Sequence, residues 1–187
     1  MQALPQLEEL LRAAFEARTS RHPSGIALAS YFARTATRGR KRSELDLSLL
    51  FPKAWKLPAL YALPETSQIT RHICVEGWSA IGSWQGVRLS DFLKRIGADT
   101  RAKYVWFQCA EGYSNTIDMA TALHPQTQLS LKFDNQILPR KYGFPMKCRM
   151  PTKLGFKNPK YVIAMHVTNQ DLGGYWEDKG YNWFSGL

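Results

Sequence analysis

Short runs of strand-forming residues, each closed by a proline, a glycine or another turn former, constrain the fold of this chain most. β-branched and aromatic residues are frequent in these runs, as they are in sheets. Asp134-Asn135 separates two of the runs and suits a tight hairpin turn, because both residue types tolerate a positive φ. The pattern predicts an α+β domain in which short helices pack on antiparallel and mixed strands. The predicted strands are 68–75, 103–109, 128–133, 136–138 and 161–167.

Helices are predicted between and before these strands. Residues 5–18 place leucines and a phenylalanine at helical spacing on one face. A second helix is expected to begin with Ser90 as its N-cap and to end at Gly97. A third is expected to begin at Asp118 and to end before Pro125. All three are short, so the strands are expected to dominate the architecture.

The size of the chain suits a single globular domain with a sizeable core. It has 187 residues, of which 44% are hydrophobic, a composition unlike that of disordered proteins. No apolar run approaches the roughly 18 residues that a membrane helix needs. No signal peptide is expected in the chain as given, because the first residues lack a basic start followed by an apolar run. The sequence therefore leaves its localisation open.

The cysteines exclude two common uses of this residue. Cys74, Cys109 and Cys148 are too few for a disulfide framework and are odd in number. The chain has no Cys-x-x-Cys pair for structural zinc, and no Cys-x-x-Cys-His motif for heme. A reactive or metal-binding thiol and a buried core thiol remain as interpretations.

Residues 71–79 concentrate several reactive side chains around Cys74. They read Arg-His-Ile-Cys-Val-Glu-Gly-Trp-Ser. Thiolate is the form of cysteine that attacks and binds metals, and neighbouring cations favour it. Arg71 is such a cation, and a protonated His72 would be another. The alternative is that Cys74 is a small buried residue, as many free cysteines are.

A second chemically distinctive stretch is residues 139–160, which hold seven lysines and arginines and no acid. Glycines and prolines interrupt this stretch, and glycine lets the backbone approach an anion that lysines neutralise. A compact phosphate suits such a loop better than an extended polyanion, while a basic surface loop is the alternative. The cations are Arg140, Lys141, Lys147, Arg149, Lys153, Lys157 and Lys160.

The segment 71–79, followed by Trp84, resembles the molybdenum-binding segment of the sulfite oxidase superfamily. Within it, the chain most resembles the molybdopterin-dependent catalytic subunits related to the bacterial protein-methionine-sulfoxide reductase. The resemblance runs from about residue 57 to residue 187. It includes Ala-x-His-Pro-x-Thr at 122–127, the loop motifs at 143–147 and 151–157, and the aromatic C-terminal segment. That segment either caps the core or roofs a substrate pocket.

The resemblance implies a sulfite-oxidase-type molybdopterin-binding fold and a single molybdenum centre with Cys74 as its ligand. Arg71 and His72 would tune the thiolate. Lys147 falls where relatives often carry arginine, which can bind an anion through two donors at once. Residues implied to contact the cofactor are Cys109, Lys147, Lys153, Gly155, Lys157, Asn158, Pro159 and Lys160.

The implied activity is oxygen-atom transfer, either sulfoxide reduction or a sulfite-type oxidation, on a small-molecule substrate. Without a heme motif, electrons are expected from a separate partner, which in relatives is often a membrane cytochrome. Many of these relatives are periplasmic. A rival hypothesis is a nucleic-acid-binding protein, suggested by the net charge of +10. No recognised nucleic-acid-binding motif supports it, so no nucleic acid is expected. The third hypothesis is a truncated relative that folds but holds no metal.

The N-terminal part departs from the family pattern. Residues 17–42 hold seven basic residues and no acid, with a short ordered piece predicted at 26–32. The Asn…Tyr-x-Phe segment that helps relatives enclose the cofactor is not found in residues 1–56. We therefore expect residues 1–56 to be an atypical, loosely ordered part that leaves the cofactor face more open. Residues 57–187 would form the molybdopterin-binding domain.

Overall fold

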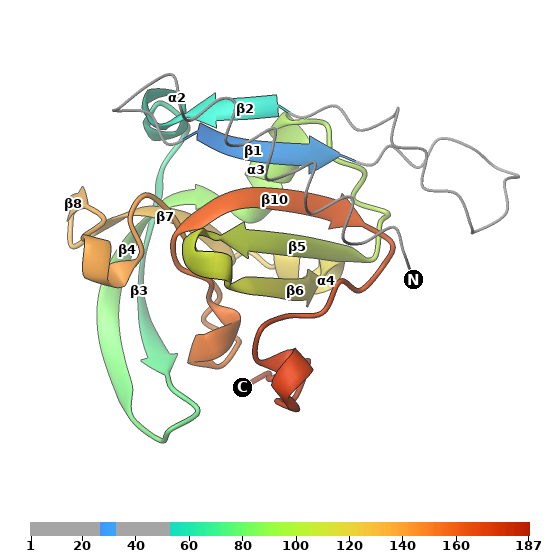
Figure 1. Ribbon diagram of the computed structural model, residues 1–187. Coiled ribbons are helices and arrows are strands. Elements are labelled where there is room, and N and C mark those ends of the chain that lie inside the picture. The colour runs from blue at the N-terminus through green and yellow to red at the C-terminus, as the bar shows by residue number, and fades with distance from the viewer. Residues whose placement is uncertain (1–26, 33–52) are drawn as a thin grey trace, which may run out of the picture.

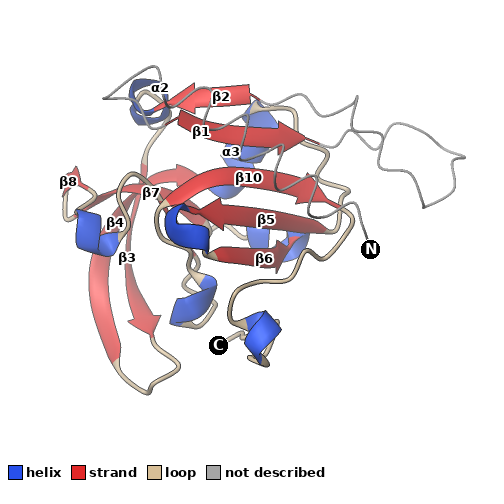
Figure 2. Ribbon diagram, viewed as in Figure 1, coloured by secondary structure: helices blue, strands red, loops and turns tan. Residues whose placement is uncertain are grey.

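The computed structural model describes residues 27–32 and 53–187, and two sheets dominate this part of the chain (Figures 1 and 2). The first sheet has the strand order β2-β1-β10-β5-β6, and the second has the order β3-β4-β7-β8, with β9 also paired to β7. The pairing of β1 with β10 is parallel, and the other pairings are antiparallel. The expected mixed, strand-rich α+β fold is confirmed.

The five strands predicted from the sequence are present within two residues of their predicted limits, whereas β2, β4, β6 and β9 were not predicted. The strands of the two sheets have the following bounds. In the first sheet they are β1 (Ala27–Phe32), β2 (Lys53–Lys56), β5 (Tyr104–Cys109), β6 (Ser114–Asp118) and β10 (Val162–Thr168). In the second sheet they are β3 (Thr66–Ile73), β4 (Ser79–Arg88), β7 (Gln128–Phe133), β8 (Gln136–Ile137) and β9 (Lys147–Arg149).

Short helices connect and cover the strands. The α-helices are α2 (Leu57–Tyr61), α3 (Leu89–Arg95) and α4 (Met119–Leu123). The 3-10 helices are η2 (Ala110–Gly112), η3 (Arg140–Tyr142), η4 (Gly155–Lys157) and η5 (Glu177–Lys179). The predicted N-cap of α3 at Ser90 is wrong by two residues, because the helix begins at Leu89 and its N-cap is Arg88. The predicted cap of α4 is confirmed, since the Asp118 carboxylate accepts the Thr121 N–H at 2.7 Å.

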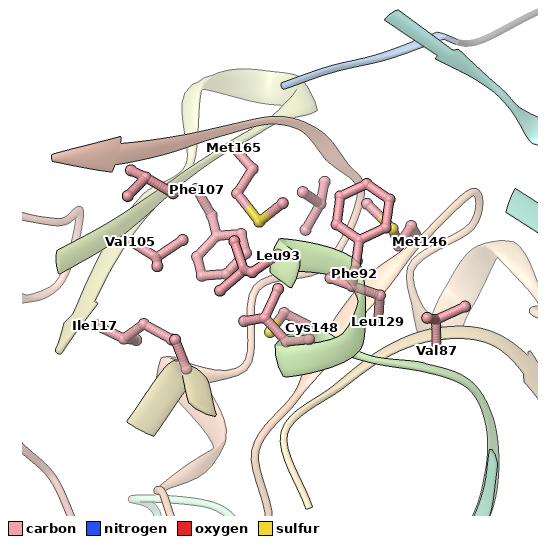
Figure 3. Close-up of a cluster of buried hydrophobic side chains, with 14 of the residues drawn as sticks. Val87, Phe92, Leu93, Val105, Phe107, Ile117, Leu129, Met146, Cys148 and Met165 are labelled. Carbon is pink, nitrogen blue, oxygen red and sulfur yellow. The ribbon is translucent and has the colours of Figure 1, made fainter. Parts of the chain in front are cut away.

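The core lies between the two sheets, and α3 supplies its centre. Phe92 and Leu93 of α3 are fully buried between Phe107 of the first sheet and Leu129 of the second (Figure 3). Strand β10 is buried along almost its whole length, because strands flank it on both sides. This core fixes the relative position of the two sheets.

Part of the expected N-terminal unit belongs to the first sheet. Strand β1 pairs with β10 from Ala29 to Phe32, and β2 pairs with β1. Backbone hydrogen bonds of these two strands therefore extend the sheet of the body, and the expected domain boundary before residue 57 stays a prediction. The short ordered piece predicted at 26–32 is confirmed as β1. The predicted helix at 5–18 and the remainder of the basic segment 17–42 lie outside the described residues.

Two features of the fold shape the candidate site. The β3–β4 hairpin extends away from the rest of the molecule, at the lower left of Figure 1, and Cys74 lies in its turn. Strand β4 was not predicted, because its first half is rich in small residues of low strand propensity; pairing with β3 and β7 imposes the strand there. The C-terminal segment 173–187 passes below β6 in the same view.

Candidate functional site

Cys74 occupies the turn of the β3–β4 hairpin. Its N–H donates to the Trp78 carbonyl at 2.9 Å, and its own carbonyl accepts the Gly77 N–H at 3.1 Å. Gly77 has φ +92°, a conformation that favours glycine. The Cys74 thiol lies 3.7 Å from Glu76 Oε2, which also accepts the Trp78 indole N–H at 3.1 Å. The turn therefore presents the thiol close to solvent, beside a carboxylate and an indole.

The other two cysteines are buried. Cys109 ends β5 and Cys148 lies in β9, and both belong to the hydrophobic core. Burial raises the pKa of the Cys109 thiol to about 12, despite the opposing charge of Lys147. Burial also raises the pKa of Cys148. Of the three cysteines only Cys74 reaches solvent, and the implied contact of Cys109 with a cofactor stays a prediction.

Arg71 and His72 point to opposite faces of β3, as neighbouring strand residues must. Arg71 is exposed, and its Nε donates to Ser79 Oγ at 3.0 Å across the hairpin. Its backbone carbonyl accepts a hydrogen bond of 2.7 Å from Arg149. The contacts of Arg71 therefore support a role in joining the hairpin to the basic loop. They give no support to the expected action of its guanidinium on Cys74.

His72 faces the basic loop and is partly buried against Gly155. A Cβ on Gly155 would lie 2.7 Å from His72 Nε2, so only glycine allows this approach. Burial, followed by the charges of Lys147, Arg149 and Lys160, lowers the pKa of His72 to about 4. His72 is therefore neutral at neutral pH and is not the second cation beside Cys74. Its buried Nδ1 has no hydrogen-bond partner among the described residues.

Lys147, Arg149 and Lys160 form one group, which we call the His72-facing cations. Lys147 and Arg149 alternate along β9 and therefore share a face, while Cys148 between them points into the core. The Lys147 ammonium lies 5.6 Å and the Arg149 guanidinium 5.8 Å from the centre of the Trp84 ring. Burial, followed by the charges of Arg149 and Lys160, lowers the pKa of Lys147 to about 7.

Arg149 is fully buried and links the basic loop to the hairpin. It donates from Nη1 to Asn158 Oδ1 and from Nη2 to the Arg71 carbonyl, each at 2.7 Å. Its buried Nε has no partner in the described part of the chain, and no carboxylate there forms an ion pair with Arg149 or Lys147. The sequence did not single out Arg149. One sequence feature could have identified it: Arg149 follows Lys147 by two residues and therefore shares its face of a short strand.

Lys153 and Lys157 form a second group, which we call the C-terminus-facing cations. The Lys157 ammonium is buried, donates to the Thr116 carbonyl at 2.8 Å and forms an ion pair with Glu177. The Lys153 ammonium lies 3.0 Å from the centre of the Phe184 ring and 4.0 Å from Asp118 Oδ2. An acid from another element thus neutralises Lys157, and this contact argues against its implied role as a direct phosphate ligand. The buried ammonium of Lys153 has no hydrogen-bond partner among the described residues, and its implied role as a phosphate ligand stays a prediction.

The remaining implied contacts shape the loop. Asn158 Oδ1 accepts from Arg149 and from the Met150 N–H, and its Nδ2 donates to the Leu154 carbonyl at 3.0 Å. The Pro159 carbonyl accepts the Cys148 N–H at 3.0 Å. Lys160 is exposed, and its ammonium donates to the Lys141 carbonyl at 3.3 Å. Lys160 can therefore reach a ligand, whereas the side chain of Asn158 is fully engaged within the loop.

The C-terminal aromatic residues form a connected cluster at the surface. Trp176 contacts Tyr175 with ring centres 5.2 Å apart and Tyr181 with ring centres 4.9 Å apart. Tyr181 in turn lies against Phe156 of η4 at 5.4 Å. Tyr175 and Tyr181 are exposed, and the expected role of this cluster as a cap on the core stays a prediction. A role beside the substrate stays a prediction.

This arrangement suits a compact, phosphorylated anion bound beside a thiol. Buried charges in proteins are normally paired, because an unpaired one is costly. Lys147 and Arg149 lack acidic partners within the described residues, and the loop between them and Lys160 contains no acid. His72 and Arg149 each have a buried nitrogen without a partner among the described residues, and the charge of Arg149 acts on His72. A ligand phosphate with hydrogen-bond acceptors would satisfy these groups.

A protein-family model described as the oxidoreductase molybdopterin binding domain matches residues 44–176 of the chain. This match covers more than half of the sequence and includes Cys74, the His72-facing cations and the start of the aromatic segment, as far as Trp176.

Named relatives agree with this match. The chain is 67% identical over 133 residues to a putative protein-methionine-sulfoxide reductase subunit, YedZ1, of Azospira oryzae, with 71% of this chain and 51% of that protein covered. It is 30% identical over 141 residues to the protein-methionine-sulfoxide reductase catalytic subunit MsrP of Burkholderia mallei, with 67% and 43% covered. The chain thus spans about half the length of the curated relatives it matches.

Among solved structures, the chain is similar to the sulfane dehydrogenase SoxCD from Paracoccus pantotrophus. The TM-score is 0.64 at 15% sequence identity, and the match covers 78% of this chain and 39% of that one. The likeness shows a shared fold and confirms the predicted sulfite-oxidase-type architecture.

Proposed function

Because the chain belongs to the oxidoreductase molybdopterin-binding domain family, we propose that it is a molybdenum-dependent oxidoreductase that transfers an oxygen atom to or from a small substrate. Sulfoxide reduction and sulfite-type oxidation are the two reactions of this class that we consider. The names of the Azospira and Burkholderia relatives favour sulfoxide reduction. Cys74 is proposed as the protein ligand of a single molybdenum centre.

The observation that carries this proposal is the position of Cys74. Its thiol is the only one of the three that reaches solvent, and it lies two residues beyond His72, which packs against Gly155 of the basic loop. A soft sulfur donor and an unpaired cationic loop therefore lie on adjoining elements. A molybdenum–pterin group needs both, because the metal accepts thiolate and the pterin carries a phosphate.

The chain's own residues hold and orient the cofactor in this proposal. When bound, the cofactor supplies the two-electron change that accompanies gain or loss of an oxygen atom. Lys147 and Arg149 would contact its anionic part from buried positions, and Lys160 from the surface. Gly155 leaves room for close approach, and neutral His72 offers a hydrogen bond without adding charge.

A separate electron-transfer partner is part of the proposal. The sequence has no Cys-x-x-Cys-His motif that would attach a heme. The Azospira relative is named as a subunit, which supports a partner protein for the related chain. A membrane cytochrome is the partner class that we propose. Within the described residues, no helix has the length and apolar character needed to cross a membrane.

The test compares Cys74→Ser with Cys148→Ala. Molybdenum and extracted pterin would be measured per chain, and turnover assayed with methionine sulfoxide and with sulfite, using dye electron donors and acceptors. Cys74→Ser should lose turnover and change the molybdenum spectrum, whereas Cys148→Ala, which replaces a core thiol, should keep both. Wild-type turnover with an unchanged spectrum in Cys74→Ser would remove Cys74 as the ligand.

Two other outcomes would favour the rival hypotheses. Purified wild-type protein that folds but contains neither molybdenum nor pterin would indicate a relative without metal. Binding of an oligonucleotide with a salt dependence equal to several neutralised phosphates, lost on substitution of Lys147 and Lys160, would indicate a nucleic-acid-binding protein.

A further inference from the structure

The C-terminal segment 173–187 attaches to the basic loop at its two C-terminus-facing cations. We propose that Glu177 of this segment is a positioning residue: it holds Lys157 away from the anion site and keeps residues 150–158 in the shape that binds the cofactor. This inference rests on the proposed function for the identity of the ligand, but the attachment itself is independent of it.

Glu177 is the centre of a buried polar group. Its Oε1 accepts from the Lys157 ammonium and from Asn115 Nδ2, the latter at 2.8 Å. Its Oε2 is buried against Gly174, where a Cβ would come within 2.3 Å of this oxygen. The Trp183 ring lies 5.0 Å from the Lys157 ammonium and covers the pair. The pair is therefore shielded from water. In such surroundings the attraction between opposite charges is strong and fixes the positions of both side chains.

The end of the chain makes a second attachment. The Leu154 N–H donates to the Ser185 carbonyl at 2.9 Å, and the Leu187 N–H donates to the Thr152 carbonyl at 3.1 Å. Lys153 and Gly186 form an antiparallel bridge between these bonds. The C-terminal segment is thus hydrogen-bonded along residues 152–154, immediately before η4.

These attachments act on the anion site through the loop. Lys157 and Asn158 are consecutive, and the side-chain oxygen of Asn158 accepts a hydrogen bond from the Arg149 guanidinium. If the pair with Glu177 is broken, Lys157 becomes a buried unpaired cation, and the loop must move to expose it to water. That movement would carry Asn158 with it and release Arg149 from its position beside His72 and Trp84.

The first experiment needs no cofactor. The wild type, Glu177→Gln and Asp178→Asn would each be purified as apo protein from a host that cannot make the pterin. Their amide hydrogen exchange would then be compared. Glu177→Gln should speed exchange in residues 150–158 by about tenfold, the equivalent of one charge-assisted hydrogen bond. Asp178→Asn removes the same charge from the neighbouring, exposed acid and should leave this exchange unchanged.

The second experiment measures pterin and molybdenum per chain in protein from a host that makes the cofactor. Glu177→Gln should lower occupancy by about tenfold. The double variant Glu177→Gln/Lys157→Met should recover most of it, because it leaves no unpaired charge. Loss of occupancy in the double variant equal to that in Glu177→Gln would show that Lys157 itself binds the cofactor, and would overturn the inference.

The two experiments separate this inference from the proposed function. Unchanged hydrogen exchange in Glu177→Gln would overturn the positioning role whatever the cofactor content. Suppose that Glu177→Gln exchanges faster but that the wild-type protein never contains pterin. The attachment would then be supported, while the proposed function would fail. If Glu177→Gln does not fold, the double variant alone still tests the inference, since it must show wild-type exchange.

Discussion

The two groups of cations in residues 139–160 share one sequence pattern and have opposite electrostatic surroundings. Lys157 forms an ion pair with Glu177, so its charge is neutralised within the protein. The Lys153 ammonium lies 4.0 Å from Asp118 Oδ2 and has no hydrogen-bond partner among the described residues. Lys147 and Arg149 are as deeply buried but form no ion pair with a carboxylate among the described residues; both lie near Trp84, and Arg149 also bonds to an amide and a backbone carbonyl. The loop sequence does not distinguish them, because the acids come from elements before and after it.

This difference indicates which cations serve a ligand. A buried cation without a counter-ion costs free energy on folding, so its retention suggests that binding an anion offsets the cost. A paired cation is already satisfied and contributes to the shape of the loop. From this comparison we propose anion binding for Lys147, Arg149 and Lys160 and loop architecture for Lys157, while the implied contact of Lys153 with the cofactor stays a prediction.

The largest expected effect is on stability, from removal of one partner of the neutralised pair. Lys157→Met leaves the buried Glu177 carboxylate unpaired and should lower the free energy of unfolding of the apo protein by about 3–5 kcal/mol. Urea denaturation at pH 7 measures this difference. Lys147→Met removes a buried cation that has no acidic partner, so it should not lower stability. Equal destabilisation by the two substitutions would contradict the comparison.

An intermediate effect is expected on the pH dependence of anion binding. Since the pKa of Lys147 is lowered to about 7, its positive charge is lost as the pH rises through 7. Sulfate keeps its charge in this range, so its affinity for the apo protein should fall by up to about tenfold per pH unit above pH 7. Titration calorimetry at constant ionic strength measures this dependence.

Lys147→Arg is the control for this titration, because arginine stays charged. It should bind sulfate with an affinity that changes little between pH 7 and 9. Stability should show the opposite trend in the wild type. The folded-state pKa of Lys147 lies below its ordinary value of 10.5, so the apo protein should gain stability as the pH rises from about 7 toward 10.5. A pH-independent sulfate affinity in the wild type would remove Lys147 from the anion site.

The smallest effect is expected from Lys160→Ala. Lys160 is exposed, and water and salt screen its charge. Sulfate affinity should fall only about twofold at low salt and should match the wild type at high salt. A loss as large as that caused by Lys147→Met would show that burial is not what distinguishes the anion-binding cations.

Much of the fold could be predicted from local sequence. Strands β5, β7 and β10 fall within a residue of their predicted limits, because β-branched and aromatic residues fill them and turn formers close them. Asp134 and Asn135 adopt φ +50° and +61° in the predicted turn. Strand β4 was not predicted, since pairing with two neighbouring strands, and not local propensity, makes it a strand.

The candidate site was only partly predictable. The sequence alone determined that residues 71–79 carry a thiol within a reactive segment and that residues 139–160 carry cations without acids. Only the tertiary structure decided that the Arg71 guanidinium bonds to Ser79 across the hairpin, that His72 is neutral, and that Glu177 neutralises Lys157. The physical reason is that charge and residue type are local properties, whereas burial and ion pairing depend on which distant elements pack together.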